Sequence, residues 1–186
     1  MGSRPPDPPL PDGRALRSLV RDIPDFPKPG IVFKDVTPLF ADPDALRATI
    51  DGVAGHAREV GADHVVSAEA RGFVLGGAVA AAAGAGFVLA RKPGKLPRDT
   101  VAVEYELEYG TDSLEVHADA LPPGARVLVH DDLLATGGTA RALCQLVEKS
   151  GATVVGCSFV IELEFLGGRE RLEGLDVRSL IAYHAD

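Results

Sequence analysis

Five short apolar runs alternate with helix-like segments through most of this chain, and this alternation restricts the fold more than any other feature. The runs are residues 63–69, 87–90, 126–132, 153–163 and 177–183. Between them the spacing of apolar side chains predicts helices at residues 43–60, 73–86 and 138–149. Strands that alternate with helices favour an α/β fold with a mainly parallel sheet flanked by helices. Ligands of such sheets bind outside the carboxyl ends of the strands.

The N-terminal part does not follow this alternation. Five of the fourteen prolines lie in the first eleven residues, which predicts a disordered arm over residues 1–13. Residues 14–42 are expected to form a small lobe, the hood, with a short helix at 14–21 and mostly irregular chain around a brief strand at 31–33. Asp42 is the predicted N-cap of the next helix, and Pro43 lies in its first turn.

Residues 97–118 also interrupt the alternation, because their side chains alternate as in an exposed antiparallel ribbon. A turn is predicted at residues 109–112. We interpret this ribbon as too polar for the core and as a flexible lid over the ligand edge of the sheet. With the hood and the lid included, residues 14–186 are predicted to form a single domain.

Composition and charge exclude several classes of protein. The net charge of -8 argues against a general binder of nucleic acid or anionic membrane. Cys144 and Cys157 are the only cysteines, too few for a disulfide framework or a cysteine zinc site, and both are expected to be reduced. The sequence shows neither the pattern of a signal peptide nor a membrane span, so a cytoplasmic protein is expected. Since the five histidines have no metal-binding spacing, we assign no metal held directly by the protein.

The stretch VLVHDDLLATGGTA, residues 127–140, carries the strongest chemical signal. A pair of carboxylates, Asp131 and Asp132, follows an apolar strand, where they can accept hydrogen bonds from sugar hydroxyls or from the water shell of a metal. Small residues then lead into a helix, so that backbone N–H groups and the positive helix end can bind a phosphate. These small residues are Ala135, Thr136, Gly137, Gly138 and Thr139. The order indicates a ribose followed by its 5′-phosphate, although neither a P-loop nor a GxGxxG motif is present.

This stretch resembles the phosphoribosyl-pyrophosphate (PRPP) motif of type I phosphoribosyltransferases. Three further stretches are similar to those of adenine phosphoribosyltransferases in particular, and the resemblance extends from about residue 22 to residue 183. They are DFPKPGIVFKDVTPLF, then ARGFVLGGAVA with ARKPGKLP, and ELEYG. The resemblance implies the type I phosphoribosyltransferase fold and a transfer of the 5-phosphoribosyl group from PRPP to adenine, giving AMP and pyrophosphate.

The resemblance also implies roles for the PRPP-binding residues. Asp131 and Asp132 would contact the ribose hydroxyls, and residues 135–139 would hold the 5′-phosphate. The turn at residues 69–72 resembles the pyrophosphate loop of the family, in which a non-proline cis peptide is usual, and the Glu69–Ala70 bond is the candidate. Arg71 in this turn is expected to take part in catalysis. Three basic residues would meet the pyrophosphate, some of them across a homodimer interface, namely Arg91, Lys92 and Lys95; Mg²⁺ would arrive with PRPP.

For the base, the resemblance implies that Val32 and Lys34 bind adenine through their backbones while Phe33 covers the ring. In the ribbon, Glu108 would handle a proton of the purine ring, and Tyr109 would close over the site. Pyrophosphate would leave ribose C1′ through an oxocarbenium-like centre as adenine N9 attacks from the opposite face.

Several residues depart from the family pattern or remain without a role in it. Glu69 stands where aspartate is expected, and Lys34 stands where arginine is expected. Arg98 matches nothing in the family and is interpreted as a solvated charge. His130 interrupts an aliphatic strand, and a packed, hydrogen-bonded histidine is favoured there over a catalytic one.

Two other functions remain open from the sequence. A different type I phosphoribosyltransferase, such as a xanthine-specific one, would share the PRPP half of the site, although the IVFKD and LEYG stretches argue against it. A PRPP-sensing regulator would keep the fold without catalysis. Such a regulator needs a DNA- or partner-binding element, and the first thirty residues are too short and proline-rich for a helix-turn-helix module.

Overall fold

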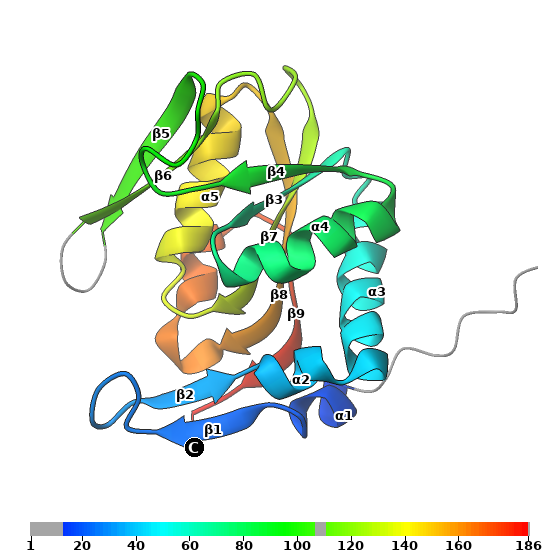
Figure 1. Ribbon diagram of the computed structural model, residues 1–186, viewed down its shortest axis with the longest axis vertical. Coiled ribbons are helices and arrows are strands. Elements are labelled where there is room, and N and C mark those ends of the chain that lie inside the picture. Colours follow the sequence, from blue (N-terminus) through cyan, green and yellow to red (C-terminus); the bar gives the residue numbers. More distant parts are fainter. Residues whose placement is uncertain (1–12, 107–110, 186) are drawn as a thin grey trace, which may run out of the picture.

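The computed structural model describes residues 13–106 and 111–185 of the chain, and Figure 1 shows the arrangement of its elements. The helices are α1 (Gly13–Arg17), α2 (Thr37–Ala41), α3 (Pro43–Glu59), α4 (Arg71–Ala83) and α5 (Gly138–Lys149), with short 3-10 helices η1 (Glu164–Leu166) and η2 (Gly168–Leu172). The strands are β1 (Arg21–Pro24), β2 (Val32–Asp35), β3 (His64–Ala68), β4 (Gly86–Ala90), β5 (Thr100–Glu106), β6 (Thr111–His117), β7 (Arg126–Leu134), β8 (Thr153–Leu163) and β9 (Val177–Tyr183).

A five-stranded sheet of order β4-β3-β7-β8-β9 forms the centre of the molecule, and all of its neighbouring strands are parallel. Helices cover both faces. Val65 and Val66 are adjacent in β3, and they enter two different hydrophobic clusters, one with α3 and α4 and one with α5. The predicted α/β class with a mainly parallel sheet is therefore confirmed. None of the described helices is long and apolar enough to cross a membrane.

The boundaries predicted from periodicity agree closely with the structure in the C-terminal half. Helix α5 and strands β8 and β9 begin and end at the predicted residues. At the start of α3, the side chain of Asp42 accepts hydrogen bonds from the backbone N–H groups of Asp44 and Ala45, as expected of an N-cap. These boundaries were predictable because each is marked by a local signal, an N-cap or a change of period.

The hood is more regular than predicted. Strands β1 and β2 pair as an antiparallel hairpin, and α2 follows, whereas the sequence indicated mostly irregular chain; α1 also ends at Arg17 rather than at residue 21. Asp25 and Gly30 both have positive φ, and Asp25 Oδ1 accepts a hydrogen bond from the Gly30 N–H at 2.8 Å, which closes the turn. The prolines are compatible with this hairpin because both strands of a two-stranded sheet are edge strands.

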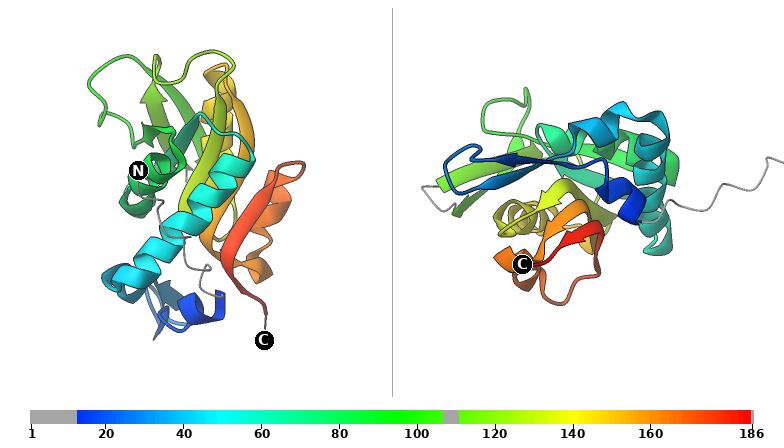
Figure 2. Two further views of the ribbon diagram at one scale, coloured as in Figure 1. Left: turned by 90° about the vertical axis from the view of Figure 1, so that its right-hand side faces the viewer. Right: turned by 90° about the horizontal axis from the view of Figure 1, so that it is seen from below.

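The hood lies at the end of the sheet where β8 and β9 finish, which is seen from below in Figure 2. Tyr183, the last residue of β9, contacts two cations of the hood. Its ring centroid lies 4.2 Å from the Arg17 guanidinium carbon and 4.3 Å from Lys34 Nζ. These contacts hold the hood beside the carboxyl ends of the strands, where ligands of parallel sheets bind.

The ribbon forms as predicted, but its assignment as too polar for the core is wrong. Strands β5 and β6 pair antiparallel in register from Thr100 opposite His117. Val103, Leu114 and Val116 are buried in the hydrophobic cluster that includes α5. Alternation places every second side chain on one face of a ribbon, and here α5 covers that face (Figure 1).

The turn predicted for this ribbon is only partly described. Thr111 and Asp112 belong to strand β6 rather than to a turn. Tyr109 and Gly110, the other half of the predicted turn, lie outside the described residues.

Candidate active site

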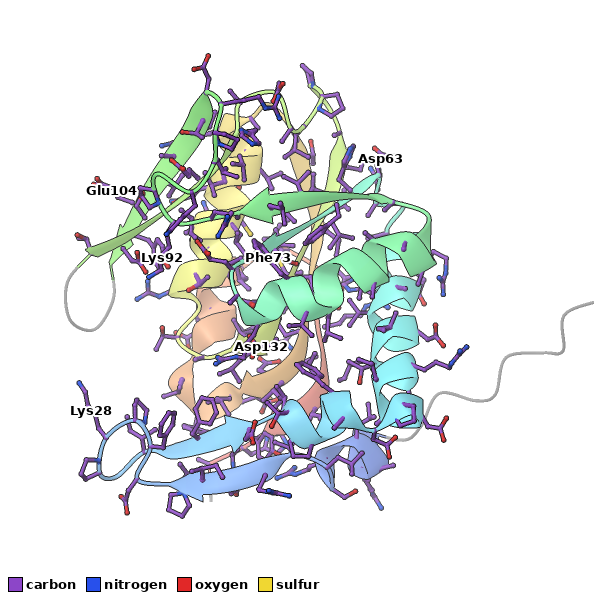
Figure 3. The ribbon with its side chains drawn as sticks, viewed as in Figure 1. Lys28, Asp63, Phe73, Lys92, Glu104 and Asp132 are labelled. Atoms are coloured by element: carbon purple, nitrogen blue, oxygen red, sulfur yellow. The ribbon has the colours of Figure 1, made fainter. Side chains whose placement is uncertain are left out.

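The paired acids lie near the carboxyl end of β7, in two different environments. Asp132 is 6% exposed, and its Oδ2 lies 2.5 Å from Arg71 Nε (Figure 3). Asp131 Oδ1 accepts the backbone N–H of Asp132 at 3.0 Å. Burial, together with the charge of Asp132, raises the pKa of Asp131 well above its usual value. Asp132 is thus paired with a cation, whereas the charged form of Asp131 is destabilised by its surroundings.

Asp131 also lies against the first turn of α4. A Cβ atom on Gly72 would be 2.7 Å from Asp131 Oδ1, so any other residue there would displace the Asp131 carboxylate. Strands β3 and β7 are neighbours in the sheet, and α4 follows β3. The contact therefore joins the acid pair to the turn at residues 69–72.

The small residues after β7 form the turn that leads into α5, as the sequence indicated. Gly137 has φ of 82° and is the N-cap of α5, which begins at Gly138. The N-cap makes no side-chain hydrogen bond to the helix, so the first backbone N–H groups of α5 remain available for an anion. Residues 135–139 therefore have the geometry of a phosphate-binding turn.

The second turn, at residues 69–72, also leads into a helix whose first backbone N–H groups are uncapped. The Glu69–Ala70 peptide bond is cis, which confirms that prediction. Ala70 is the N-cap of α4, and again no side chain caps the helix. Two helices, α4 and α5, thus follow neighbouring strands of the sheet and begin with uncapped backbone N–H groups. Each helix start can bind one anion, so the pair suits a ligand with two separate phosphate groups.

Arg71 connects three parts of the site. Besides its ion pair with Asp132, its guanidinium carbon lies 5.5 Å from the ring centroid of Phe33 in the hood. Half of its side chain is exposed, so the guanidinium can reach a bound anion.

The basic segment after β4 is attached to the second turn through Glu69. Its Oε1 accepts the backbone N–H of Lys92 at 2.6 Å, and its Oε2 lies 3.0 Å from Arg91 Nη2. The hydrogen bond from the Lys92 N–H is the main reason why the pKa of Glu69 is lowered. Lys95 is exposed. Arg98 forms an ion pair with Asp119 at the surface, in agreement with its interpretation as a solvated charge.

In the hood, the proposed base-binding residues are placed together on β2. Val32 is 49% exposed, and the rings of Phe33 and Phe26 meet edge to face at 5.2 Å between centroids. Lys34 Nζ pairs with Asp22 Oδ1 at 2.7 Å, so its side chain already has a partner and only its backbone is left for a base. Glu108 and Tyr109 lie outside the described residues.

His130 is fully buried, and its Nδ1 lies 2.9 Å from the carbonyl oxygen of Ser158. Burial lowers the pKa of His130 to about 4, so the ring is neutral at neutral pH. The structure therefore places it as a packed, hydrogen-bonded core residue, as the sequence favoured. Within residues 13–106 and 111–185, no group of three or more His, Cys, Asp or Glu side chains could hold a metal ion.

Sequence reasoning missed two residues, Tyr105 and Asp112, which pair near the end of the ribbon where β5 leads to β6. The Tyr105 hydroxyl lies 3.4 Å from Asp112 Oδ2, and its side chain also interacts with Thr139 of the phosphate-binding turn. Asp112 Oδ2 lies 3.0 Å from Lys92 Nζ, so the ribbon, the basic segment and that turn meet here; Figure 3 shows Lys92 beside the ribbon. Alternation alone gave no signal for these contacts, because it does not indicate what faces a ribbon.

Comparison with known proteins agrees with this geometry. Residues 44–179 match the phosphoribosyl transferase domain family. An adenine phosphoribosyltransferase of Rubrobacter xylanophilus is 62% identical over 172 residues, which cover 92% of this chain and 93% of that protein. The chain belongs to the adenine phosphoribosyltransferase family.

Solved structures of adenine phosphoribosyltransferases have the same fold. The enzyme of Thermoanaerobacter pseudethanolicus superposes with a TM-score of 0.89 at 49% identity, covering 92% of this chain and 99% of that one. The Saccharomyces cerevisiae enzyme, complexed with an imino-altritol bisphosphate and adenine, superposes with a TM-score of 0.86 at 40% identity, covering 90% and 97%. The family and fold inferred from the four sequence motifs are therefore confirmed.

Proposed function

We propose that this protein is a purine salvage enzyme that transfers the 5-phosphoribosyl group of PRPP to adenine and releases AMP and pyrophosphate. The observation that carries the proposal is the order along β7 and α5. A carboxylate pair is followed within three residues by a turn whose backbone N–H groups are uncapped. This order fits a ribose joined to its 5′-phosphate. The yeast relative was crystallised with adenine, which supports adenine as the base.

In this proposal, Asp131 and Asp132 accept hydrogen bonds from the ribose hydroxyls, and residues 135–139 bind the 5′-phosphate. Arg71 pairs with Asp132 in the structure. When PRPP is bound, a ribose hydroxyl donates a hydrogen bond to the Asp132 carboxylate. The Arg71 guanidinium then turns to the pyrophosphate, whose negative charge grows as the bond to C1′ breaks.

The pyrophosphate would bind at the second uncapped turn. The backbone N–H of Ala70 donates to it, the carboxylate of Glu69 holds Arg91 and Lys92 beside it, and the cations of Arg91, Lys92 and Lys95 balance its charge. The acid pair offers only oxygen atoms, which suit the water shell of Mg²⁺. Mg²⁺ bound with PRPP would supply further positive charge to the leaving group.

Adenine would bind between the hood and the sheet. The backbone groups of Val32 and Lys34 read the edge of the base, and Phe33 covers its face. N9 of adenine forms the bond to C1′ as the bond to pyrophosphate breaks, and the purine ring gives up a proton. Glu108 would accept this proton, while Tyr109 closes the site against water.

We further propose that the active form is a homodimer in the cytoplasm. Two large apolar side chains are exposed on neighbouring elements at one edge of the sheet, Val74 at 56% in α4 and Leu89 at 42% in β4. Burial of such side chains favours association. Both cysteines are free thiols, which agrees with a reducing compartment.

Base selectivity is the direct test. The purified protein is incubated with Mg²⁺, PRPP and, separately, adenine, hypoxanthine, guanine, xanthine or orotate. We expect AMP from adenine and no nucleotide from the other bases; product from another base in preference to adenine would refute the proposed substrate. The double variant Asp131→Asn, Asp132→Asn should lose most turnover, whereas Asp51→Asn, on α3, serves as the matched control and should keep it.

A further inference from the structure

The segment that connects β8 to β9 packs against the backbone of the phosphate-binding turn. A Cβ atom on Gly168, at the start of η2, would lie 2.1 Å from the Ala135 carbonyl oxygen and 3.0 Å from the Gly137 nitrogen. A Cβ atom on Gly137 would lie 2.4 Å from the Gly168 carbonyl oxygen. The two backbones are therefore in direct contact, and neither position has room for a side chain.

The residue after Gly168 anchors this connection to the sheet. Arg169 Nε and Nη2 lie 2.9 Å and 2.5 Å from the two carboxylate oxygens of Glu162 on β8. Arg169 Nη1 donates to the Val177 carbonyl on β9 at 2.7 Å. The Glu162 side chain is 3% exposed, and Ser179 Oγ donates to it at 2.6 Å. Arg169 thus joins two strands to η2 through a bidentate ion pair whose carboxylate is buried, although half of the Arg169 side chain is exposed.

The phosphate-binding turn needs such support because it has little of its own. It contains a left-handed glycine and no side-chain cap, so it loses more conformational freedom when it is ordered than a capped turn would. Backbone N–H groups bind a phosphate well only when they are held in place before it arrives.

We propose that Arg169 is a positioning residue for PRPP. Through Glu162 and the Val177 carbonyl, it holds Gly168 against Ala135 and Gly137 and so keeps the backbone N–H groups of the turn directed at the 5′-phosphate. The kinetic part of this inference rests on the proposed function; the structural part, that Arg169 orders the turn in the ligand-free protein, does not.

The first test changes the contact itself. Gly168→Ala should displace the turn, because the backbone at Gly168 is not left-handed and the new Cβ acts only by its volume. We expect KM for PRPP to rise by about tenfold or more, while KM for adenine at saturating PRPP stays close to that of the unsubstituted protein. Gly55→Ala is the control, because a Cβ there would meet nothing within 4 Å. An unchanged KM for PRPP in Gly168→Ala would overturn the proposal.

The second test changes the anchor. Arg169→Lys keeps the charge but cannot hold both oxygens of Glu162 and the Val177 carbonyl together. We expect a raised KM for PRPP and, in the ligand-free protein, faster hydrogen exchange of the backbone N–H groups of residues 136–139. Arg171→Lys, on the exposed side of the same 3-10 helix, should change neither quantity.

These readouts separate the possible outcomes. A lower melting temperature with unchanged exchange at the turn and unchanged KM for PRPP means that Arg169 is merely structural, which refutes the proposal. If the unsubstituted protein forms no nucleotide from any base, the proposed function fails, and hydrogen exchange still decides whether Arg169 orders the turn. If Arg169→Lys does not fold, the Gly168→Ala result decides.

Discussion

The two neighbouring carboxylates of the acid pair differ in what they contribute to the folded protein. Asp132 has Arg71 as its partner, whereas the half-buried Asp131 lies beside that same negative charge. In the proposed site, Asp131 stays available as an acceptor for a ribose hydroxyl, and the cost of keeping its charge there lowers the stability of the fold.

Asp131→Asn should therefore stabilise the ligand-free protein while it weakens PRPP binding. The raised pKa means that Asp131 contributes most to stability below its usual value of 3.8, and that this contribution is lost as pH rises through the raised pKa. At pH 8 we expect the variant to melt about 2–4 °C higher, a difference that shrinks toward pH 4. Asp132→Asn, which loses the Arg71 partner, should not gain stability. Thermal unfolding followed by circular dichroism over this pH range measures both, and a lower melting temperature for Asp131→Asn at pH 8 contradicts the argument.

His130 should make the fold sensitive to acid. Its pKa is lowered from 6.5 to about 4, so the folded protein keeps the ring neutral while the unfolded chain takes up a proton. This contribution to stability is complete above pH 6.5 and is lost as pH falls to about 4, by roughly 3 kcal/mol. His56, whose pKa is also lowered, chiefly by burial, acts in the same direction.

The contribution of His130 is isolated by comparison with His130→Asn. Asparagine offers an N–H donor for the Ser158 carbonyl but does not titrate. Urea unfolding between pH 7.5 and 4 should show a smaller loss of free energy of unfolding in the variant. Identical pH slopes for the two proteins would exclude His130 as a source of the acid sensitivity.

At the scale of residues, the sequence indicated candidate side chains for the site but not the contacts that they make. The acid pair and the turn after it follow from local order along the chain, whereas the cis Glu69–Ala70 bond was implied by the family resemblance alone. The pairing of Asp132 with Arg71 and the contact of Gly168 with Gly137 join segments far apart in sequence, and no local pattern indicates them.

At the scale of elements, the N-cap of α3 is worth testing because that helix packs against α2, the last element of the hood. Asp42→Ala removes the acceptor of two backbone N–H groups and should lower the free energy of unfolding by about 1 kcal/mol. Asp42→Asn keeps an acceptor oxygen and should lose much less. Urea denaturation compares the two, and equal losses would show that the cap does not act through its hydrogen bonds.

Elements whose partners are local were predicted well, and elements whose partners are distant were not. Helix α5 has a clear apolar face and a glycine stop, so its bounds followed from the sequence. The hood hairpin depends on a turn with positive φ at Asp25, which is uncommon for residues other than glycine, and the buried face of the ribbon depends on α5. Propensity and alternation predict neither the positive φ at Asp25 nor the helix that covers the ribbon.

At the scale of the whole molecule, the proposed dimer determines whether the site is complete. β4 is an edge strand of the sheet, and the basic segment with Arg91 and Lys92 follows it directly. A second copy that covers Val74 and Leu89 would thus lie close to the start of the pyrophosphate site. Association and activity should then depend on the same surface.

The double variant Val74→Glu, Leu89→Glu places two charges on this surface, where burial would leave them unpaired, so the dimer should dissociate. Sedimentation equilibrium should give the monomer mass for the variant and the dimer mass for the unsubstituted protein. Phe165→Glu, a control at a side chain that is 53% exposed beyond the end of β8, should remain a dimer. Turnover should fall in the double variant by about tenfold or more if cations of the partner meet the pyrophosphate. Full turnover in a monomeric variant would show that each protomer contains a complete site. It would contradict the proposal that cations of the partner meet the pyrophosphate.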